Sequence, residues 1–401
     1  MSQLEKKQKR LNVKQWLKAN WISMAVLLLL LAVGVVLYVV AHPAASEDAV
    51  RPTDYTEYEN AVVREILADS CEADEISEGH YRGQQLLTAE VLSGQYKGET
   101  MLVDNVVGPV YGEKLEAGDR VTVSISTYED GTVRAAVYES DRSIAVYLLI
   151  GAFLLITVLV GGKVGLKSLL GLALTVGALL FILLPLLLKG WPTILTTFMI
   201  SVLVAAIAFV ILGGVNRKTN CAFLGTFAGI ALATVFGLVA QRMLHIDGYR
   251  HEYGEALLQL RQTGESMIGI TGLIVAGVVV SALGAVMDVA MSIASAIHEL
   301  AEVGENMTVR RLFKSGMNIG RDMVGTMTNT LILAIIGSGL TLIVYIYSLG
   351  LPATQFLSSP YLALEMVSGI ASSCGVVLAV PFTALVSAVA YGKKEKSREN
   401  K

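Results

Sequence analysis

The sequence predicts an α-helical multi-pass membrane bundle of about eight transmembrane helices, with a small extracytoplasmic β-rich domain inserted after the first helix. Three observations support this fold class. Of the 401 residues, 54% are hydrophobic and only 16% are charged, and the mean hydropathy is +0.60. Long apolar runs recur along the chain. Only residues 42–142 interrupt them at length. These values exclude an ordinary soluble enzyme.

A helix needs about 20 mostly apolar residues to cross the hydrocarbon layer. Eight segments meet this condition: 22–41, 143–162, 166–188, 191–213, 222–239, 267–290 with a possible extension, 323–349 and 362–391. The first segment also resembles a signal peptide, but its apolar run is longer than the usual signal core, which favours a retained anchor. The last segment is long enough to tilt or to bend at Pro381.

Basic residues set the expected orientation, because Lys and Arg in short segments stay on the cytoplasmic side. With both termini inside, the cytoplasmic segments hold 19 basic residues, against four in the short segments on the other side. The chain then divides into a basic cytoplasmic N-terminus (1–21), a membrane anchor (22–41), an acidic extracytoplasmic domain (42–142), a seven-helix membrane domain (143–391) and a basic cytoplasmic tail (392–401). We expect these segments to lie in and around a lipid bilayer.

The inserted domain carries 21 acidic and eight basic residues. After an irregular acidic stretch at 47–59, its second half alternates apolar and polar residues around two turns, one in SGQYKGET and one at Asp130-Gly131, as β-hairpins do. A small β-barrel or sandwich is expected, and the OB barrel is one such fold. The acidic surface is explained by solubility alone; collecting cations or docking a basic partner are alternatives.

Small residues recur every four positions in the fifth segment, at Gly225, Gly229, Ala233 and Gly237. Such a stripe lets a neighbouring helix backbone approach closely. We interpret it as architecture.

The sixth segment has a polar stripe instead. Ser281, Asp288, Ser292, Ser295 and Glu299 follow one another at helical spacing and share one face. A carboxylate at mid-bilayer costs about 2.5–3.5 kcal/mol on insertion scales, so Asp288 should face the bundle interior or water. If the helix starts at residue 267, however, Asp288 already approaches the cytoplasmic headgroups.

Two further stripes follow, in the seventh and eighth segments. Asp322, Thr326 and Asn329 share one face, and the buried amide of Asn329 is expected to find hydrogen-bond partners on the Asp288 and Ser292 face. Glu365 and Ser372 recur at similar spacing in the eighth segment. The three stripes predict a polar path lined by Asp288, Ser292, Ser295, Asp322, Thr326, Asn329, Glu365 and Ser372, and the alternative is hydrogen bonding that only joins helices.

The phrases GAVMDVAMSIASAIHEL and GRDMVGTMTNTLILA, with the SGQYKGET turn, resemble the YibE/F-like family of bacterial multi-pass membrane proteins. The large insert makes the chain similar to a YibE-type member and unlike the shorter YibF type. The resemblance implies a permease of no established substrate. It also implies either a YibF-type membrane partner or a homodimer.

Two functions from different classes compete on this evidence. The first is a membrane transporter or permease component that uses the polar path. The second is a non-transporting membrane scaffold or sensor whose extracytoplasmic domain binds an envelope partner. Transport requires water at Asp288, whereas a scaffold permits its neutral replacement.

Enzymatic chemistry is not expected. The chain lacks the GxxxxGK[ST], HExxH and GxSxG motifs. An intramembrane aspartyl protease would pair Asp288 with Asp322, but Arg321 stands where the GxGD motif has glycine. The three cysteines have no spacing typical of zinc or disulfides, and near-neutral net charge gives no reason to expect nucleic acid. We assign no catalytic, cofactor-binding or metal-binding residue.

Overall fold

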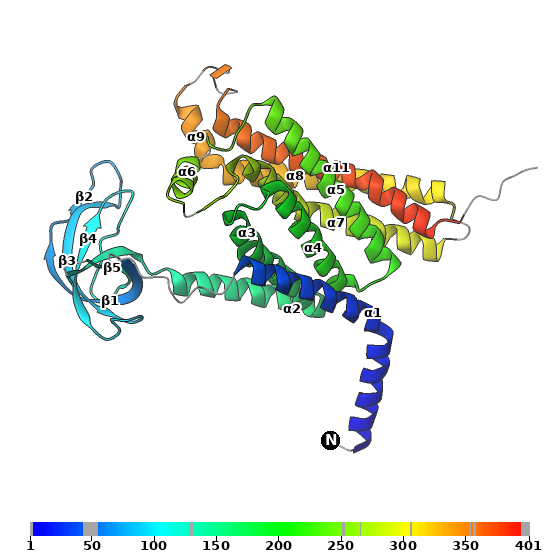
Figure 1. Ribbon diagram of the computed structural model, residues 1–401, viewed down its shortest axis with the longest axis horizontal. Coiled ribbons are helices and arrows are strands. Elements are labelled where there is room, and N and C mark those ends of the chain that lie inside the picture. Colours follow the sequence, from blue (N-terminus) through cyan, green and yellow to red (C-terminus); the bar gives the residue numbers. More distant parts are fainter. Residues whose placement is uncertain are drawn as a thin grey trace, which may run out of the picture. The chain divides into compact units, whose positions relative to one another are not determined.

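The computed structural model describes residues 3–42, 55–128, 131–250, 253–264, 266–304, 307–350, 352, 354–355 and 358–393. Most of the predicted irregular stretch 47–59 and of the basic tail lies outside these residues. The chain forms two compact units. One is Ala44–Val160, and the other combines Met1–Pro43 with Gly161–Lys401. Figure 1 shows both units and labels most of their helices and strands.

The first unit contains a closed barrel of five strands. These are β1 (Tyr55–Asp69), β3 (Tyr81–Val91), β4 (Thr100–Val107), β5 (Arg120–Thr127) and β6 (Val133–Ser140), with the short β2 (Glu72–Ala73) added beside β3. The order is β1-β5-β6-β4-β3, and a pairing of β3 with β1 closes the ring. All neighbours are antiparallel except β4 and β6. This is the strand order of the OB fold.

Two hairpins and one bent strand explain the closure. The turn between β3 and β4 contains Gly94 and Gly98, and the turn between β5 and β6 contains Gly131, each with positive φ. Both turns fall where the sequence predicts them, although Asp130 lies outside the described residues. Register shifts within β1, between Val63 and Glu65 and between Ile66 and Ala68, are bulges that let one strand pair with two neighbours. The predicted β-rich domain is confirmed, and the sandwich alternative is wrong.

The barrel continues into the next helix with almost no linker. Strand β6 ends at Ser140, and helix α2 (Ser143–Ala178) begins three residues later. The Ser143 amide donates to Asp141 Oδ1 over 2.9 Å, and Arg142 forms ion pairs with Glu113 and Glu139. Hydrogen bonds from Ser143 are the main reason that the pKa of Asp141 lies below its usual value. The junction is therefore fixed by several local bonds.

The helices of the second unit follow the predicted apolar segments closely. They are α1 (Gln3–Ala41), the latter part of α2, η1 (Leu179–Leu183), α3 (Leu184–Leu188), α4 (Thr193–Gly213), α5 (Arg217–Met243), α6 (Gly254–Gln262), η2 (Ile270–Gly272), α7 (Leu273–Val303), α8 (Val309–Ser338), α9 (Leu340–Ser348) and α11 (Pro360–Tyr391). Within the described residues, six helices are long and apolar enough to cross a membrane, or seven if the bent pair α8–α9 counts as one span.

Two of the eight predicted spans share one helical stretch. Predicted segments 143–162 and 166–188 both fall on Ser143–Leu188, whose 46 residues extend about 69 Å at about 1.5 Å per residue, more than twice the roughly 30 Å that one span needs. Gly162 interrupts this stretch with φ 55° and ψ −133°, a conformation outside the helical region. The interruption lies at the predicted boundary, but helical structure resumes directly after it.

One correction concerns the basic residues between the sixth and seventh predicted segments, which are expected in a cytoplasmic loop. Helix α8 begins at Val309, with the Thr308 side chain accepting a hydrogen bond from the Arg311 amide at its start. The basic residues of this region therefore lie on a helix. Hydropathy alone left these residues outside the predicted segments, because the first turns of this helix are polar.

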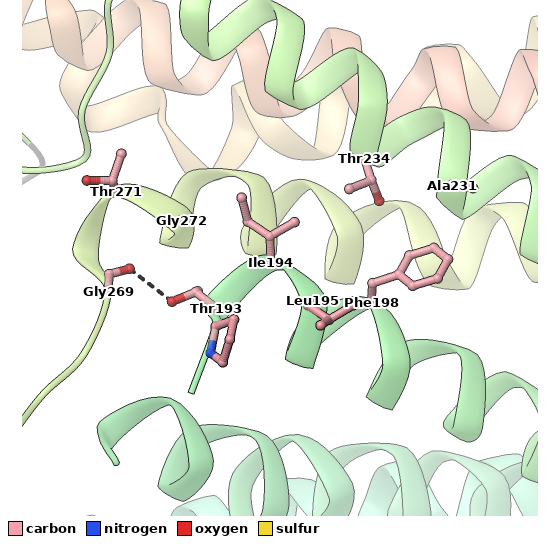
Figure 2. Close-up of a pocket in the computed structure, with 10 residues that line it drawn as sticks. Thr193, Ile194, Leu195, Phe198, Ala231, Thr234, Gly269, Thr271 and Gly272 are labelled. Carbon is pink, nitrogen blue, oxygen red and sulfur yellow. Dashed lines mark hydrogen bonds between the residues drawn. The ribbon is translucent and has the colours of Figure 1, made fainter. Parts of the chain in front are cut away.

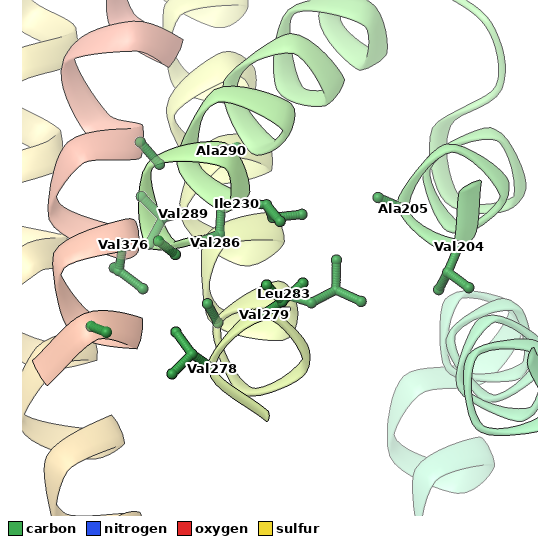
Figure 3. Packing of buried hydrophobic residues seen from close by; sticks show 14 of the residues in the cluster. Val204, Ala205, Ile230, Val278, Val279, Leu283, Val286, Val289, Ala290 and Val376 are labelled. Carbon is green, nitrogen blue, oxygen red and sulfur yellow. The ribbon is translucent and has the colours of Figure 1, made fainter. Parts of the chain in front are cut away.

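The core of the second unit lies where α5, α7 and α11 pack against one another, while α8 contacts α11 and α7. Figure 3 shows Val286, Val289, Ile230 and Val376 meeting there. A Cβ at Gly229 would lie 2.6 Å from Val286 Cγ1 and 2.8 Å from Ala379 Cβ. The small-residue stripe of the fifth segment is buried, so its predicted architectural role is confirmed.

Candidate functional site

The polar stripe of the sixth predicted segment lies on an exposed face of α7. Ser281, Asp288, Ser292 and Glu299 are exposed, and Ser295 is half-buried. The opposite face carries Val279, Val286 and other apolar residues with no solvent-accessible surface. Polar and apolar residues thus occupy opposite sides of one helix. The predicted common face is confirmed, but it points away from the core of the chain.

Asp288 has no hydrogen bond or ion pair among the described residues. It stands in a helix whose apolar window meets the length and hydropathy of a membrane span. A charge facing lipid at such a position costs about 2.5–3.5 kcal/mol on insertion scales. This exposed carboxylate therefore requires either water or another protein surface in front of it.

One predicted pair of stripes does meet. Ser281 Oγ on α7 lies 2.6 Å from Ser372 Oγ on α11, and Ser372 Oγ also donates to the Val278 carbonyl over 3.3 Å. Ser372 is fully buried. These bonds join α7 to α11 in the manner of interhelical hydrogen bonds. Ser372 is thus placed as a structural contact between helices.

The stripe of the seventh predicted segment points away from this contact. Gly316 and Gly320 are buried where α8 packs against α7 and α11, whereas Asp322 and Asn329 are exposed on the other side of α8. The Thr326 hydroxyl donates to the Met323 carbonyl of its own helix over 3.1 Å. In the described residues, Asn329 makes no hydrogen bond to Asp288 or Ser292. A single chain therefore does not bring the two stripes together.

Glu365 lies beside a break in the helices. Helices α8 and α9 meet at Gly339 with a bend of 61°, and the Glu365 carboxyl carbon lies 3.8 Å from a Cβ built at Gly339. The half-buried Glu365 borders two cavities of about 280 and 780 Å³. The smaller cavity has an apolar lining, whereas the larger cavity is also lined by Tyr345 and Tyr361. This carboxylate is separate from the α7 stripe.

Sequence reasoning missed a cavity of about 600 Å³ between the start of α4, α5 and the segment before α7. Figure 2 shows Thr193 of α4 beside Gly269, whose carbonyl accepts the Thr193 hydroxyl hydrogen over 3.0 Å. Phe198 and Thr234 border the same cavity. In the sequence, this cavity is marked only by Pro192-Thr193 at the start of α4 and by the glycines near η2. Both patterns are typical of ordinary turns, so they do not indicate a cavity.

The barrel holds a second polar site that sequence reasoning missed. A cavity of about 420 Å³ is bordered by Asp69, Gln84, Asp104 and Asn105. The Asp69 pKa is lowered to about 2, chiefly by the hydrogen bond from the Cys71 amide and then by Lys114, whose Nζ lies 3.0 Å from Asp69 Oδ2. Asp69 therefore keeps its charge at neutral pH.

Two buried amides support this cavity. The Asn105 amide donates to Gln85 Oε1 over 3.0 Å and to the Glu113 carbonyl over 2.9 Å. The Leu115 amide also donates to Gln85 Oε1, and Gln85 Nε2 returns a bond to the Leu115 carbonyl. Together they fasten the segment 113–115 across the barrel. Alternation alone marks these positions as apolar, which is why their role escaped prediction.

Comparisons with known proteins give one result. The family model described as YibE/F-like protein matches residues 149–393. No curated protein and no solved structure matches the chain. The matched range contains the latter part of α2 and every later helix, and it begins after the barrel.

Proposed function

This chain belongs to the YibE/F-like family, and from that premise we propose that it is a membrane permease component. The observation that carries the proposal is the exposed polar face of α7, with Asp288 at its centre. In a membrane this face needs water or protein before it. A water-filled path along α7 satisfies that need and uses the carboxylate to bind a proton or cation.

The path is completed by a neighbouring protein surface. Within one chain, the exposed stripe of α8 faces away from α7, and Ser372 is buried in a helix contact. In the proposed arrangement, Asp288, Ser292 and Ser295 form one wall of the path. Asp322 and Asn329 lie on a separate exposed face of α8. The role is binding and passage, without an enzymatic step.

We propose a plasma-membrane location with both termini cytoplasmic and residues 42–142 outside. The distribution of basic residues supports this orientation. In that orientation Asp288 lies at the middle of α7, and the acidic barrel faces the envelope.

The first experiment measures water at the path. In a variant without natural cysteines, Ser292→Cys is compared with Leu195→Cys, which places a thiol on the exposed apolar face of α4. A thiol reacts with a water-soluble maleimide only where water lets it ionise. We expect Ser292→Cys to react at least about tenfold faster in membrane vesicles. If both cysteine variants react equally slowly, α7 does not line a water-filled path.

The second experiment measures transport directly. Purified protein in liposomes is tested for proton, sodium and potassium flux under an imposed gradient. Asp288→Asn should abolish any flux that the parent protein supports, because the amide cannot carry the charge. Asp104→Asn in the barrel is the matched control and should leave that flux unchanged.

A scaffold or sensor is the second candidate, favoured by the polar cavity of the barrel. Asp69 and Asp104 border this cavity in a domain that carries 21 acidic residues in its full range. A basic envelope partner fits this charge. The scaffold would be favoured if cells with Asp288→Asn keep the parent phenotype while cells with Asp69→Asn and Asp104→Asn lose the function.

A further inference from the structure

Glu365 is a second carboxylate on a candidate membrane helix that lacks a cationic partner. It is half-buried on α11 and makes no hydrogen bond or ion pair with another described residue. A charge on such a helix requires a compensating group or water. The α7 path does not supply one, because no described residue of α7 lines either of the two cavities at Glu365.

The two cavities at Glu365 follow one another along α11. Tyr361 precedes Glu365 and lines the larger cavity, of about 780 Å³. Gly369 and Ile370 come after Glu365 and line the smaller cavity, of about 280 Å³. Glu365 and Gly339, at the bend between α8 and α9, border both cavities. The carboxylate therefore lies where the two cavities meet.

The two cavities differ in chemical character. Apart from Glu365, the smaller cavity is lined only by Ile, Leu, Met and Gly residues. Apolar cavities stay dry and accept apolar ligands. The larger cavity has Tyr345, Tyr361 and hydroxyl side chains in its lining. Aromatic rings attract cations to their faces. Among the described lining residues of both cavities, only Glu365 carries a charge.

The order of the cavities matches the layers of a bilayer. Helix α11 has 32 residues and starts at Pro360. It is about 48 Å long at about 1.5 Å per residue, and the hydrocarbon layer is about 30 Å thick. With α11 centred in the bilayer, Glu365 lies about 8 Å from its start, near the border between headgroups and hydrocarbon. Ile370 lies deeper. An amphipathic molecule places its charged end and its apolar end in the same order.

We propose that this site binds an organic ammonium ion that carries an apolar chain. The ammonium group pairs with Glu365 beside the rings that line the larger cavity, and the chain enters the smaller cavity. A metal ion leaves the apolar cavity unused, and the described residues contain no group of three His, Cys, Asp or Glu side chains that could hold one. Two sources supply this chemistry: the headgroup of a membrane lipid and a free alkylammonium ion.

The inference does not depend on the proposed function, because a sensor can also bind such a cation. The full chain is purified in a maltoside detergent, which contains no ammonium, and is dialysed to equilibrium against radiolabelled hexyltrimethylammonium. Saturable binding to the parent is expected. Glu365→Gln should raise the Kd at least about tenfold, because the Coulomb attraction is lost. The matched control is Glu255→Gln, an exposed carboxylate on α6, which should leave the Kd within about twofold.

Competitors test the two halves of the site separately. Tetramethylammonium lacks the chain and hexanol lacks the charge, so each should displace the labelled probe at least about tenfold less well than unlabelled hexyltrimethylammonium. Replacing both Tyr345 and Tyr361 by Ala should raise the Kd at least about threefold. Replacing both by Phe should leave it unchanged, because the rings attract the cation and the hydroxyls are not required.

Native mass spectrometry distinguishes the two sources once the probe is shown to bind at Glu365. Phosphatidylethanolamine and phosphatidylglycerol with the same acyl chains are added separately. A lipid source is assigned if the parent retains phosphatidylethanolamine, Glu365→Gln loses it, and neither protein retains phosphatidylglycerol. A free cation is assigned if neither lipid is retained or displaces the probe. Either result supports the site.

Three results would overturn the proposal. The first is a Kd for Glu365→Gln equal to that of the parent, and the second is displacement by hexanol or potassium as effective as by the unlabelled probe. The third is binding that is lost in Asp288→Asn and kept in Glu365→Gln, which would place the cation at α7. Glu365→Asp keeps the charge and should bind more tightly than Glu365→Gln, which separates loss of charge from loss of fold. Binding without any flux would contradict the proposed function alone, and flux without binding would contradict this inference alone.

Discussion

The barrel and the helical unit treat polar side chains in opposite ways. In the barrel, Gln85 and Asn105 are almost fully buried, and their amides form hydrogen bonds with one another and with the 113–115 segment. In the helical unit, Asp288 is exposed and has no bond in the described residues. Contacts within the chain explain why Gln85 and Asn105 are polar. They do not explain Asp288, whose charge requires water or another protein surface.

This difference shows where a function should be sought. A buried polar group with all its partners present stabilises the fold. A charge left on an exposed face of an apolar helix indicates a missing neighbour or water. Substitutions in the helix core, at the buried barrel amides and at Asp69 test this difference.

The largest effect is expected where helix backbones approach most closely. Gly229→Val would place side-chain atoms inside Val286 and Ala379, so the substitution should lower stability by about 3 kcal/mol. Gly151→Val is the matched control, because a Cβ there meets nothing within 4 Å. Thermal unfolding in detergent measures both. Similar midpoints for the two variants would show that the core does not need the glycine.

An intermediate effect is expected for the buried amides of the barrel. Asn105→Ala leaves the Glu113 carbonyl without its donor and should destabilise the barrel by about 2 kcal/mol. The neighbouring exposed Asp104→Ala should change stability by less than about 0.5 kcal/mol. Hydrogen exchange of the Leu115 amide reports the difference. If both variants exchange at the parent rate, the amide pair has no structural role.

The smallest effect is a pH dependence at Asp69. Its pKa falls from 3.8 to about 2 in the folded barrel, so its contribution to stability is present above pH 3.8 and is lost as pH falls toward 2. Asp69→Asn should reduce stability at pH 7 and approach the parent at low pH. Lys114→Met should weaken the same dependence. Denaturant unfolding at several pH values measures it, and a parallel pH profile for parent and Asp69→Asn would contradict it.

Sequence patterns predicted local structure better than they predicted neighbours. The hairpin turns at Gly94, Gly98 and Gly131 and the buried stripe at Gly229 were predicted correctly, because turn chemistry and helical spacing act locally. The common face of Ser281 and Asp288 was also correct. Helical spacing predicts which residues share one face of a helix. It does not predict which neighbour that face points toward.

The errors share that cause. Asn329 was expected to face Asp288, yet the two lie on faces that do not meet within the chain. The direction of each face depends on which helices pack where, and Gly316 and Gly320 decide this on α8. Gln85 and Asn105 were missed because their bonds join strands to a distant loop segment. The eight spans stay a prediction, because two of them share one helical stretch of 46 residues that is interrupted at Gly162.

The short junction between β6 and α2 has a mechanical consequence. Only Asp141 and Arg142 separate the strand from the helix, and both are held by local bonds. A force on the barrel would therefore be transmitted directly to the first part of α2, and Gly162 is the first interruption of the helix along the chain. A ligand that displaces the barrel would move residues 143–161 of α2 with it.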